Sequence, residues 1–292
     1  PYLLNFPHIP PPYCYRCPWD KTYPDCALPC AEELRRVVQQ EGQENVAAFI
    51  AEPVIGTSMS AVVPPPEYYV KIREICDEHD MLLIVDEVMS GVGRTGKNWG
   101  IEHWNVTPDM ITTSKGVSSG YAPLGVLTLR DKVWQAIADG SKTVTQSSTY
   151  GGNPVSCAAG VAVLNYIEQH NLVSRAARLG DRLMQKLKDG LNDVPVVGQV
   201  RGKGLFIGIE IVADKSSREP FPAAWKVTER IEEETFRNSL LILGGVPGMI
   251  NAVAGDHFEL LPPYVIQDEH LDLMVEIVRK AILKVVSELP VT

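Results

Sequence analysis

Lys115 and an upstream acidic pair are the residues of this chain whose chemistry can be coupled. Lys115 lies in DMITTSKGVSSGYAPLG, just after a short apolar run, and Asp86–Glu87 ends another apolar run, MLLIVDEV. A lysine amine that is placed and partly desolvated can attack a carbonyl and form a Schiff base. An aspartate at the end of a buried strand needs a cation or a hydrogen-bond donor as its partner. The alternative is an exposed lysine and a solvated acidic turn, both of which are common on protein surfaces.

One cofactor, pyridoxal 5'-phosphate (PLP), offers a partner to each of these two groups. Its aldehyde suits the amine of Lys115, and its protonated pyridine nitrogen suits the carboxylate of Asp86. The pair therefore favours a PLP site over an unrelated surface lysine only if the surrounding sequence agrees.

Four sequence blocks occur in order: FIAEPVIG at 49–56, IVDEVMSGVGRTGKNWG at 84–100, TPDMITTSKGVSSGYAPLG at 107–125 and SSTYGGNPVSCAAGVAVL at 147–164. Together they resemble the class III (omega) aminotransferases, which are PLP enzymes of fold type I, from about Val46 to the C-terminus. Four ordered blocks are far more specific than a single Gly-rich motif. The resemblance implies an α/β fold and a transaminase that moves an amino group from an amine or ω-amino acid to an oxo acid such as pyruvate.

The resemblance also implies roles for three residues around the cofactor. Lys115 would bind the PLP aldehyde and then carry a proton between the substrate and the cofactor. Asp86 would hold the pyridine nitrogen protonated, which makes the ring an electron sink. Val88 lies two residues further on the same strand face and would pack against the ring, although an ordinary core position remains an equal alternative.

Three more residues are assigned by the same resemblance. Glu52, in the AEP context, matches a glutamate that sits beside the cofactor; the alternative is a carboxylate that belongs to a turn. Ser148 and Thr149, in SSTYGGNP, match the part that reaches the cofactor phosphate of a partner subunit, which requires a homodimer or a dimer of dimers with its active site at the subunit interface. The alternative is a pair of loop hydroxyls in a Gly-rich turn. Arg94, in VGRTG, is expected to support the loop.

The chain departs from the family where relatives bind a substrate carboxylate. Many relatives carry an arginine just before the LLPP-like strand, and here that position is Glu259, in HFELLPP. Pyruvate-using relatives often carry an arginine at the position of Ala252. Arg201 and Arg237 are candidates to replace this bidentate clamp. The loss of both arginines leaves open a PLP-dependent lyase of the same family.

A second departure concerns the front of the chain. No G-[ST]-E-A-like block, which cradles the PLP phosphate in relatives, precedes Val46. The sequence therefore resembles the C-terminal two-thirds of such an enzyme, and a non-catalytic fragment remains an alternative.

Composition excludes several other classes of protein. The 292 residues carry a formal net charge of −9 with no cluster of Lys and Arg, which argues against nucleic-acid binding. No apolar run approaches the length that spans a bilayer. The first residues lack the order of a secretory signal, so we expect a cytoplasmic enzyme.

Four of the six cysteines crowd the first thirty residues. Cys14, Cys17, Cys26 and Cys30 have the spacing C-x2-C-x8-C-x3-C. This spacing suits a tetrahedral zinc site, but the intervening loop is shorter than in common zinc modules. Reduced loop thiols are the favoured interpretation, with no metal assigned.

The order of apolar and amphipathic segments predicts two α/β domains. We expect a cofactor-binding large domain over residues 1–170, incomplete at its N-terminus, and a smaller C-terminal domain over 171–292. The expected helices cover 31–42, 65–80, 153–169, 174–190 and 269–289. The expected strands cover 47–54, 81–88, 110–114, 123–130, 239–245 and 257–266, with a hairpin over 196–212.

Overall fold

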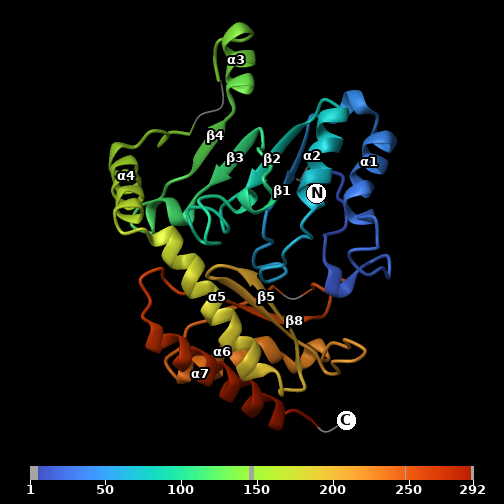
Figure 1. Cartoon of the computed structure of the whole chain (residues 1–292), viewed down its shortest axis with the longest axis vertical. Coiled ribbons are helices and arrows are strands. Elements are labelled where there is room, and N and C mark those ends of the chain that lie inside the picture. Colours follow the sequence, from blue (N-terminus) through green and yellow to red (C-terminus); the bar gives the residue numbers. More distant parts are fainter. Residues whose placement is uncertain (1–5, 145–147, 247, 291–292) are drawn as a thin grey trace. The chain divides into compact units, whose positions relative to one another are not determined.

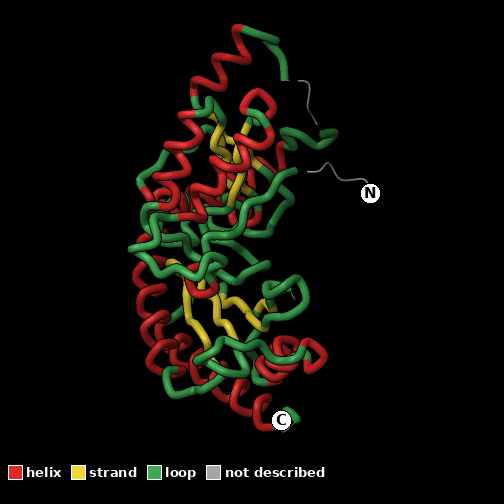
Figure 2. Tube along the Cα trace, turned by 90° about the vertical axis from the view of Figure 1, so that its right-hand side faces the viewer, coloured by secondary structure: helices red, strands yellow, loops and turns green. Residues whose placement is uncertain are grey.

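The computed structural model describes residues 6–144, 148–246 and 248–290, and its chain is an α/β protein with two separate four-stranded sheets. The chain forms two compact units (Figure 1). The first unit comprises residues 1–53, 64–89 and 99–165. The second comprises residues 54–63, 90–98 and 166–292. Figure 2 shows the strands gathered into two groups, one in each unit.

The sheet of the first unit is mostly parallel. Its order is β1 (Ala48–Ala51), β2 (Leu82–Asp86), β3 (Met110–Thr113) and β4 (Val126–Leu129). β1, β2 and β3 run parallel, and β4 pairs with β3 in the antiparallel sense. Parallel neighbours place their carboxyl ends at one edge of the sheet, where ligands of α/β proteins commonly bind.

α2 (Tyr68–Glu78) packs against the sheet of the first unit, and α1 (Pro29–Glu41) packs on α2. Leu83 and Val85 on β2 are fully buried, and α2 packs against this strand through its apolar side. The unit also contains α3 (Asp131–Asp139) and most of α4 (Pro154–Gln169). Asn153 caps α4, because its side-chain oxygen accepts the N–H groups of Val155 and Ser156.

The second unit has an antiparallel sheet with helices on one face. The sheet order is β5 (Val197–Lys203), β6 (Phe206–Ile211), β8 (Asp256–Leu260) and β7 (Leu243–Gly244). The helices are α5 (Leu172–Leu191), α6 (Val227–Arg237) and α7 (Asp268–Ser287). Ile207, Ile209 and Phe258 are fully buried in the core that these helices share with the sheet.

Short 3-10 helices connect these elements. They are η1 (Cys14–Arg16), η2 (Gln43–Asn45), η3 (Gly100–Trp104), η4 (Lys115–Ser118) and η5 (Ala223–Trp225). No described helix is long and apolar enough to cross a membrane.

The structure confirms most expected elements and corrects two of them. The expected hairpin over 196–212 is β5 and β6, which pair antiparallel. The expected strand over 239–245 is reduced to Leu243–Gly244, and the strand expected over 257–266 ends at Leu260 because Pro262 and Pro263 follow. α3 and α6 are two helices that were not expected from the sequence. The predicted domain boundary at residue 170 stays a prediction for the whole protein.

Candidate active site

The carboxyl ends of β2 and β3 bring the two central candidates to one edge of the sheet. Asp86, the last residue of β2, is the register partner of Thr112 on the adjacent strand β3. Lys115 follows β3 after Ser114 and begins η4. Because β2 and β3 are parallel, both residues lie where their strands end at the same side of the sheet.

Lys115 has an unusual backbone conformation. Its φ angle is +43°, in the left-handed region that non-glycine residues seldom adopt. Such conformations cost about 1–3 kcal/mol and cluster at functional sites. The side chain is exposed, and its Nζ atom lies 2.9 Å from the Sδ atom of Met89, three residues after Asp86. A thioether is an uncharged, weak hydrogen-bond acceptor. The contact therefore positions the amine without forming the ion pair that a carboxylate would form.

Asp86 is half-buried and only partly satisfied by protein donors. Its Oδ1 atom accepts the Val88 N–H at 3.0 Å. Within the described ranges no other hydrogen bond to this carboxylate occurs, which leaves acceptor capacity for a ligand. Val88 itself is half-buried. Its position is compatible with packing against a flat ligand and equally with a partly covered core.

Glu87, the other acid of the pair, has a different role. It is fully buried, and its carboxylate accepts the N–H groups of Gly100 at 2.9 Å and Ile101 at 2.8 Å. Gly100 and Ile101 are the first residues of the 3-10 helix η3, so their N–H groups have no acceptor within that helix. The acidic pair therefore combines a structural helix cap at Glu87 with a candidate ligand-binding carboxylate at Asp86. Sequence reasoning missed this cap, since two adjacent acids look alike.

Glu52 lies at the same sheet edge. It follows the register pair Ala51–Val85 of β1 and β2, which places it one step beyond the strand, level with Asp86. Glu52 is half-buried, and its backbone carbonyl accepts the Tyr69 hydroxyl at 2.6 Å. This hydrogen bond from Tyr69 on α2 holds the backbone of Glu52 in place.

Ser148 and Thr149 lie in an exposed turn ahead of α4. The Ser148 carbonyl accepts the Gly151 N–H at 2.9 Å, which closes the turn. Both residues are exposed. In the portions of the chain that are described, no hydrogen bond joins either of them to Asp86 or Lys115.

The two arginine candidates for a carboxylate clamp, Arg201 and Arg237, lie in the second unit, and both are paired with acidic residues there. Arg201 on β5 is 7% exposed and donates to Glu210 at 2.8 Å and to the carbonyls of Ser60 and Met59. The suggestion that Arg201 binds a substrate carboxylate is therefore wrong, because its guanidinium is already engaged. Arg237 ends α6 on the surface, where it pairs with Glu233.

Two further positions that the sequence singled out, Arg94 and Glu259, also lie in the second unit. Arg94 donates to the carbonyls of Leu205 and Pro262 and stacks on the Tyr264 ring, in agreement with its expected loop role. Glu259 is fully buried within β8.

Comparisons with known proteins show the family and the fold of the chain. The sequence matches the family Aminotransferase class-III over residues 1–282. It is 34% identical to the uncharacterized aminotransferase YodT of Bacillus subtilis over 98% of this chain and 64% of that protein. It is 41% identical to the taurine–pyruvate aminotransferase of Bilophila wadsworthia over 77% of this chain and 50% of that protein.

A solved amine transaminase from an uncultivated Pseudomonas species, described as PLP-bound, superposes with a TM-score of 0.86. The two are 35% identical, over 94% of this chain and 61% of that one. The chain belongs to the class III aminotransferases, a PLP-dependent family of fold type I. It spans less than two-thirds of the length of the relatives it matches.

The residues at the sheet edge fit two parts of PLP. An amine at Lys115 suits the aldehyde, and the incompletely bonded carboxylate of Asp86 suits the protonated ring nitrogen. The third part, the phosphate, has the hydroxyls of Ser148 and Thr149 as candidates in an exposed turn.

Proposed function

We propose that the protein is a PLP-dependent aminotransferase that moves an amino group from an amine or ω-amino acid to an oxo acid such as pyruvate. The observation that supports it most strongly is the placement of Lys115 and Asp86 after adjacent parallel strands of a class III aminotransferase fold.

The proposed roles follow from the groups at this edge. PLP, when bound, supplies the electron sink that makes the α-proton of an amine substrate removable. Lys115 Nζ would hold the aldehyde of PLP, and the same amine would carry the α-proton of the substrate. Asp86 would hold the protonated ring nitrogen through a charge-assisted hydrogen bond. Val88 would contact the ring, and Glu52 would lie beside the cofactor.

The proposed substrate is an amine whose recognition does not depend on Arg201. That guanidinium is buried against Glu210 and two carbonyls, so it offers no bidentate site to a carboxylate. The relative named as a taurine–pyruvate aminotransferase supports pyruvate as the acceptor.

A homodimer is part of the proposal. α4 consists largely of apolar residues, yet Val155 is 74% exposed, Val161 59% and Leu164 46%. A helix that is apolar on most sides is normally buried. A second copy that covered α4 would also bring Ser148 and Thr149, which precede this helix, to the phosphate of the partner's cofactor. Sedimentation of the protein should give a dimer, and Val155→Asp with Val161→Asp should give a monomer.

One assay tests the reaction. The protein with added PLP should convert pyruvate to alanine in the presence of an amine donor, without release of ammonia. Ammonia release without alanine would instead support a lyase of the same family, and the absence of both products would contradict an active enzyme.

A further inference from the structure

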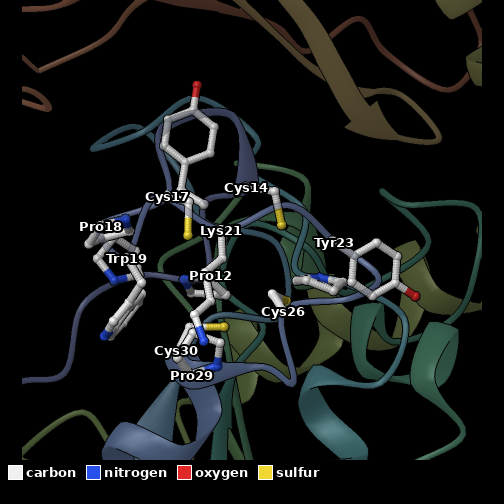
Figure 3. Close-up of a pocket in the computed structure, with 13 residues that line it drawn as sticks. Pro12, Cys14, Cys17, Pro18, Trp19, Lys21, Tyr23, Cys26, Pro29 and Cys30 are labelled. Atoms are coloured by element: carbon white, nitrogen blue, oxygen red, sulfur yellow. The ribbon is translucent and has the colours of Figure 1, made fainter.

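The cysteine cluster near the start of the chain does not have the arrangement of a metal site. Cys14, Cys17, Cys26 and Cys30 line one small cavity together with prolines and aromatic residues (Figure 3). None of these thiols forms a disulfide. Within the ranges that the structure describes, no group of three or more His, Cys, Asp or Glu side chains could hold a metal ion. A different part of the chain, residues 90–98, carries an inference about the candidate active site.

Residues 90–98, which we call the 90–98 loop, belong to the second unit but are flanked in the chain by residues of the candidate active site. The loop begins directly after Met89, whose Sδ atom contacts the Nζ atom of Lys115. It ends two residues before Gly100, whose N–H group donates to the carboxylate of Glu87. The conformation of the loop therefore bears on the backbone that carries the contact to the Lys115 amine.

The 90–98 loop contains a β-branched residue in a conformation that such residues avoid. Val92 is buried and has a φ angle of +55°, in the left-handed region where a branched side chain crowds the backbone. Backbone strain of this kind persists only where the surrounding structure holds it, and it clusters at functional sites. Within the loop, the Gly93 N–H donates to the Asn98 carbonyl at 3.2 Å, and the Gly96 N–H donates to the Gly93 carbonyl at 3.0 Å.

Tyr264 and Arg94 hold the 90–98 loop within the second unit. The hydroxyl of Tyr264 donates to the carbonyl of Val92, the strained residue itself, at 2.9 Å. Arg94 stacks on the Tyr264 ring and donates to the carbonyls of Leu205 at 3.2 Å and Pro262 at 2.7 Å. The Leu205 N–H in turn donates to the Arg94 carbonyl at 3.0 Å. The Tyr264 ring supports Arg94 while its hydroxyl binds Val92.

Close backbone contacts leave this loop little freedom. A Cβ atom at Gly96 would lie 2.7 Å from the Cα atom of Ala177 on α5, and one at Gly204 would lie 2.4 Å from the carbonyl carbon of Thr95. Only glycine permits backbone approaches of this kind. Residues 90–93, which lead from Met89 to the strained turn, are all buried. A change at Val92 is therefore passed along a packed backbone.

We propose that Tyr264 is a positioning residue for the amine of Lys115 and acts through Val92 and Met89. The Tyr264 hydroxyl holds Val92 in its strained conformation, three residues after Met89. Without this hydrogen bond Val92 relaxes, the backbone that carries Met89 changes direction, and the sulfur leaves the Nζ atom of Lys115. The inference rests on the proposed function for the use that is made of this amine, whereas the position of the amine is measurable without PLP.

The test measures the reactivity of the Lys115 amine in the whole chain by trace acetylation with acetic anhydride, without PLP. Peptide mass spectrometry gives the labelling of Lys115 relative to Lys188, an exposed lysine on α5. Tyr264→Phe removes the hydroxyl and keeps the ring, and it should raise this ratio at least threefold because Met89 no longer holds the amine. Thr228→Val is the matched control: it removes a buried hydroxyl of α6 that donates to Asp256 at 3.0 Å, and it should leave the ratio unchanged.

A double-mutant cycle separates transmission through Met89 from a general loss of stability. Met89→Leu conserves the side-chain volume but removes the sulfur acceptor, so it should raise the labelling ratio as Tyr264→Phe does. In the Met89→Leu background, Tyr264→Phe should add no further change, because the contact on which it acts is already gone. Additive effects of the two substitutions would overturn the proposal, as would an unchanged ratio in Tyr264→Phe. Failure of the wild type to bind PLP would count against the proposed function alone, since these ratios are measured without the cofactor.

Discussion

The Nζ atom of Lys115 lies 2.9 Å from the Sδ atom of Met89, which joins the segments that follow the adjacent strands β3 and β2. Met89 comes three residues after Asp86, so this contact holds the amine near the strand end that carries the carboxylate. The amine of Lys115 and the carboxylate of Asp86 therefore lie at the same edge of the sheet.

Asp86→Asn should lower kcat by about 10²–10³-fold, the range observed when one preorganised electrostatic partner is removed. Asn keeps an oxygen for the Val88 N–H, so the turn after β2 should persist. The loss should arise because a neutral amide cannot stabilise a protonated ring nitrogen. Steady-state kinetics with saturating PLP measures it, and an unchanged kcat would remove Asp86 from the proposed chemistry.

Glu87→Gln should destabilise the fold by about 1–3 kcal/mol, because two buried N–H groups lose a charged acceptor. Urea unfolding followed by fluorescence gives the change in free energy. Glu102→Gln, in the same 3-10 helix η3, is the control and should stay within about 0.5 kcal/mol. Equal stabilities of the two variants would show that the cap is unimportant.

Arg201→Gln should destabilise the protein by about 3–5 kcal/mol, because it leaves the buried Glu210 without its cation. Arg237→Gln, on the surface of α6, should change stability by less than about 0.5 kcal/mol. Replacing Arg201 and Glu210 together by leucine should cost less than Arg201→Gln alone. If Arg201→Gln kept full stability and raised only the KM for the oxo acid, Arg201 would be a substrate residue after all.

His257 should give the protein a pH-dependent stability. Burial, and then the charge of Arg201, lower the pKa of His257 to about 4 from its ordinary value of 6.5. The unfolded chain therefore binds a proton at a pH where the folded chain does not, so this contribution is present above pH 6.5 and is lost as pH falls toward 4. The loss amounts to about 3 kcal/mol. His257→Gln should flatten the stability difference between pH 6.5 and pH 4, and urea midpoints across this range check it; parallel curves for the two proteins would contradict it.

The sequence predicts where the candidate residues stand relative to the strands better than it predicts the contacts around them. Lys115, Asp86 and Glu52 could be placed at strand ends because each follows an apolar run, and such runs in α/β proteins end at a shared edge. The sequence could not show that Glu87 caps η3 while Asp86 is left for a ligand. That difference depends on the N–H groups of Gly100 and Ile101, which lie beside the carboxylate of Glu87 only in the folded chain. Arg201 was misjudged for the same reason, because its partner Glu210 becomes its neighbour only when β5 pairs with β6.

Two helices were missed for a different physical reason. α3 and α6 have amphipathic patterns, with buried Val227 and Ile231 one turn apart on α6. The many charged residues of α6 obscured this spacing. α3 is followed by Gly140, a stop signal that the sequence reasoning did not use.

Covalent capture of PLP tests the central claim most directly. Incubation of the protein with PLP followed by borohydride reduction should leave one phosphopyridoxyl group on Lys115, identified by peptide mass spectrometry. Lys115→Ala should carry none, whereas Lys97→Ala, which removes an exposed loop lysine, should be labelled like the wild type. Equal labelling of the Lys115→Ala variant and the wild type, or a label spread over several surface lysines, would contradict the account.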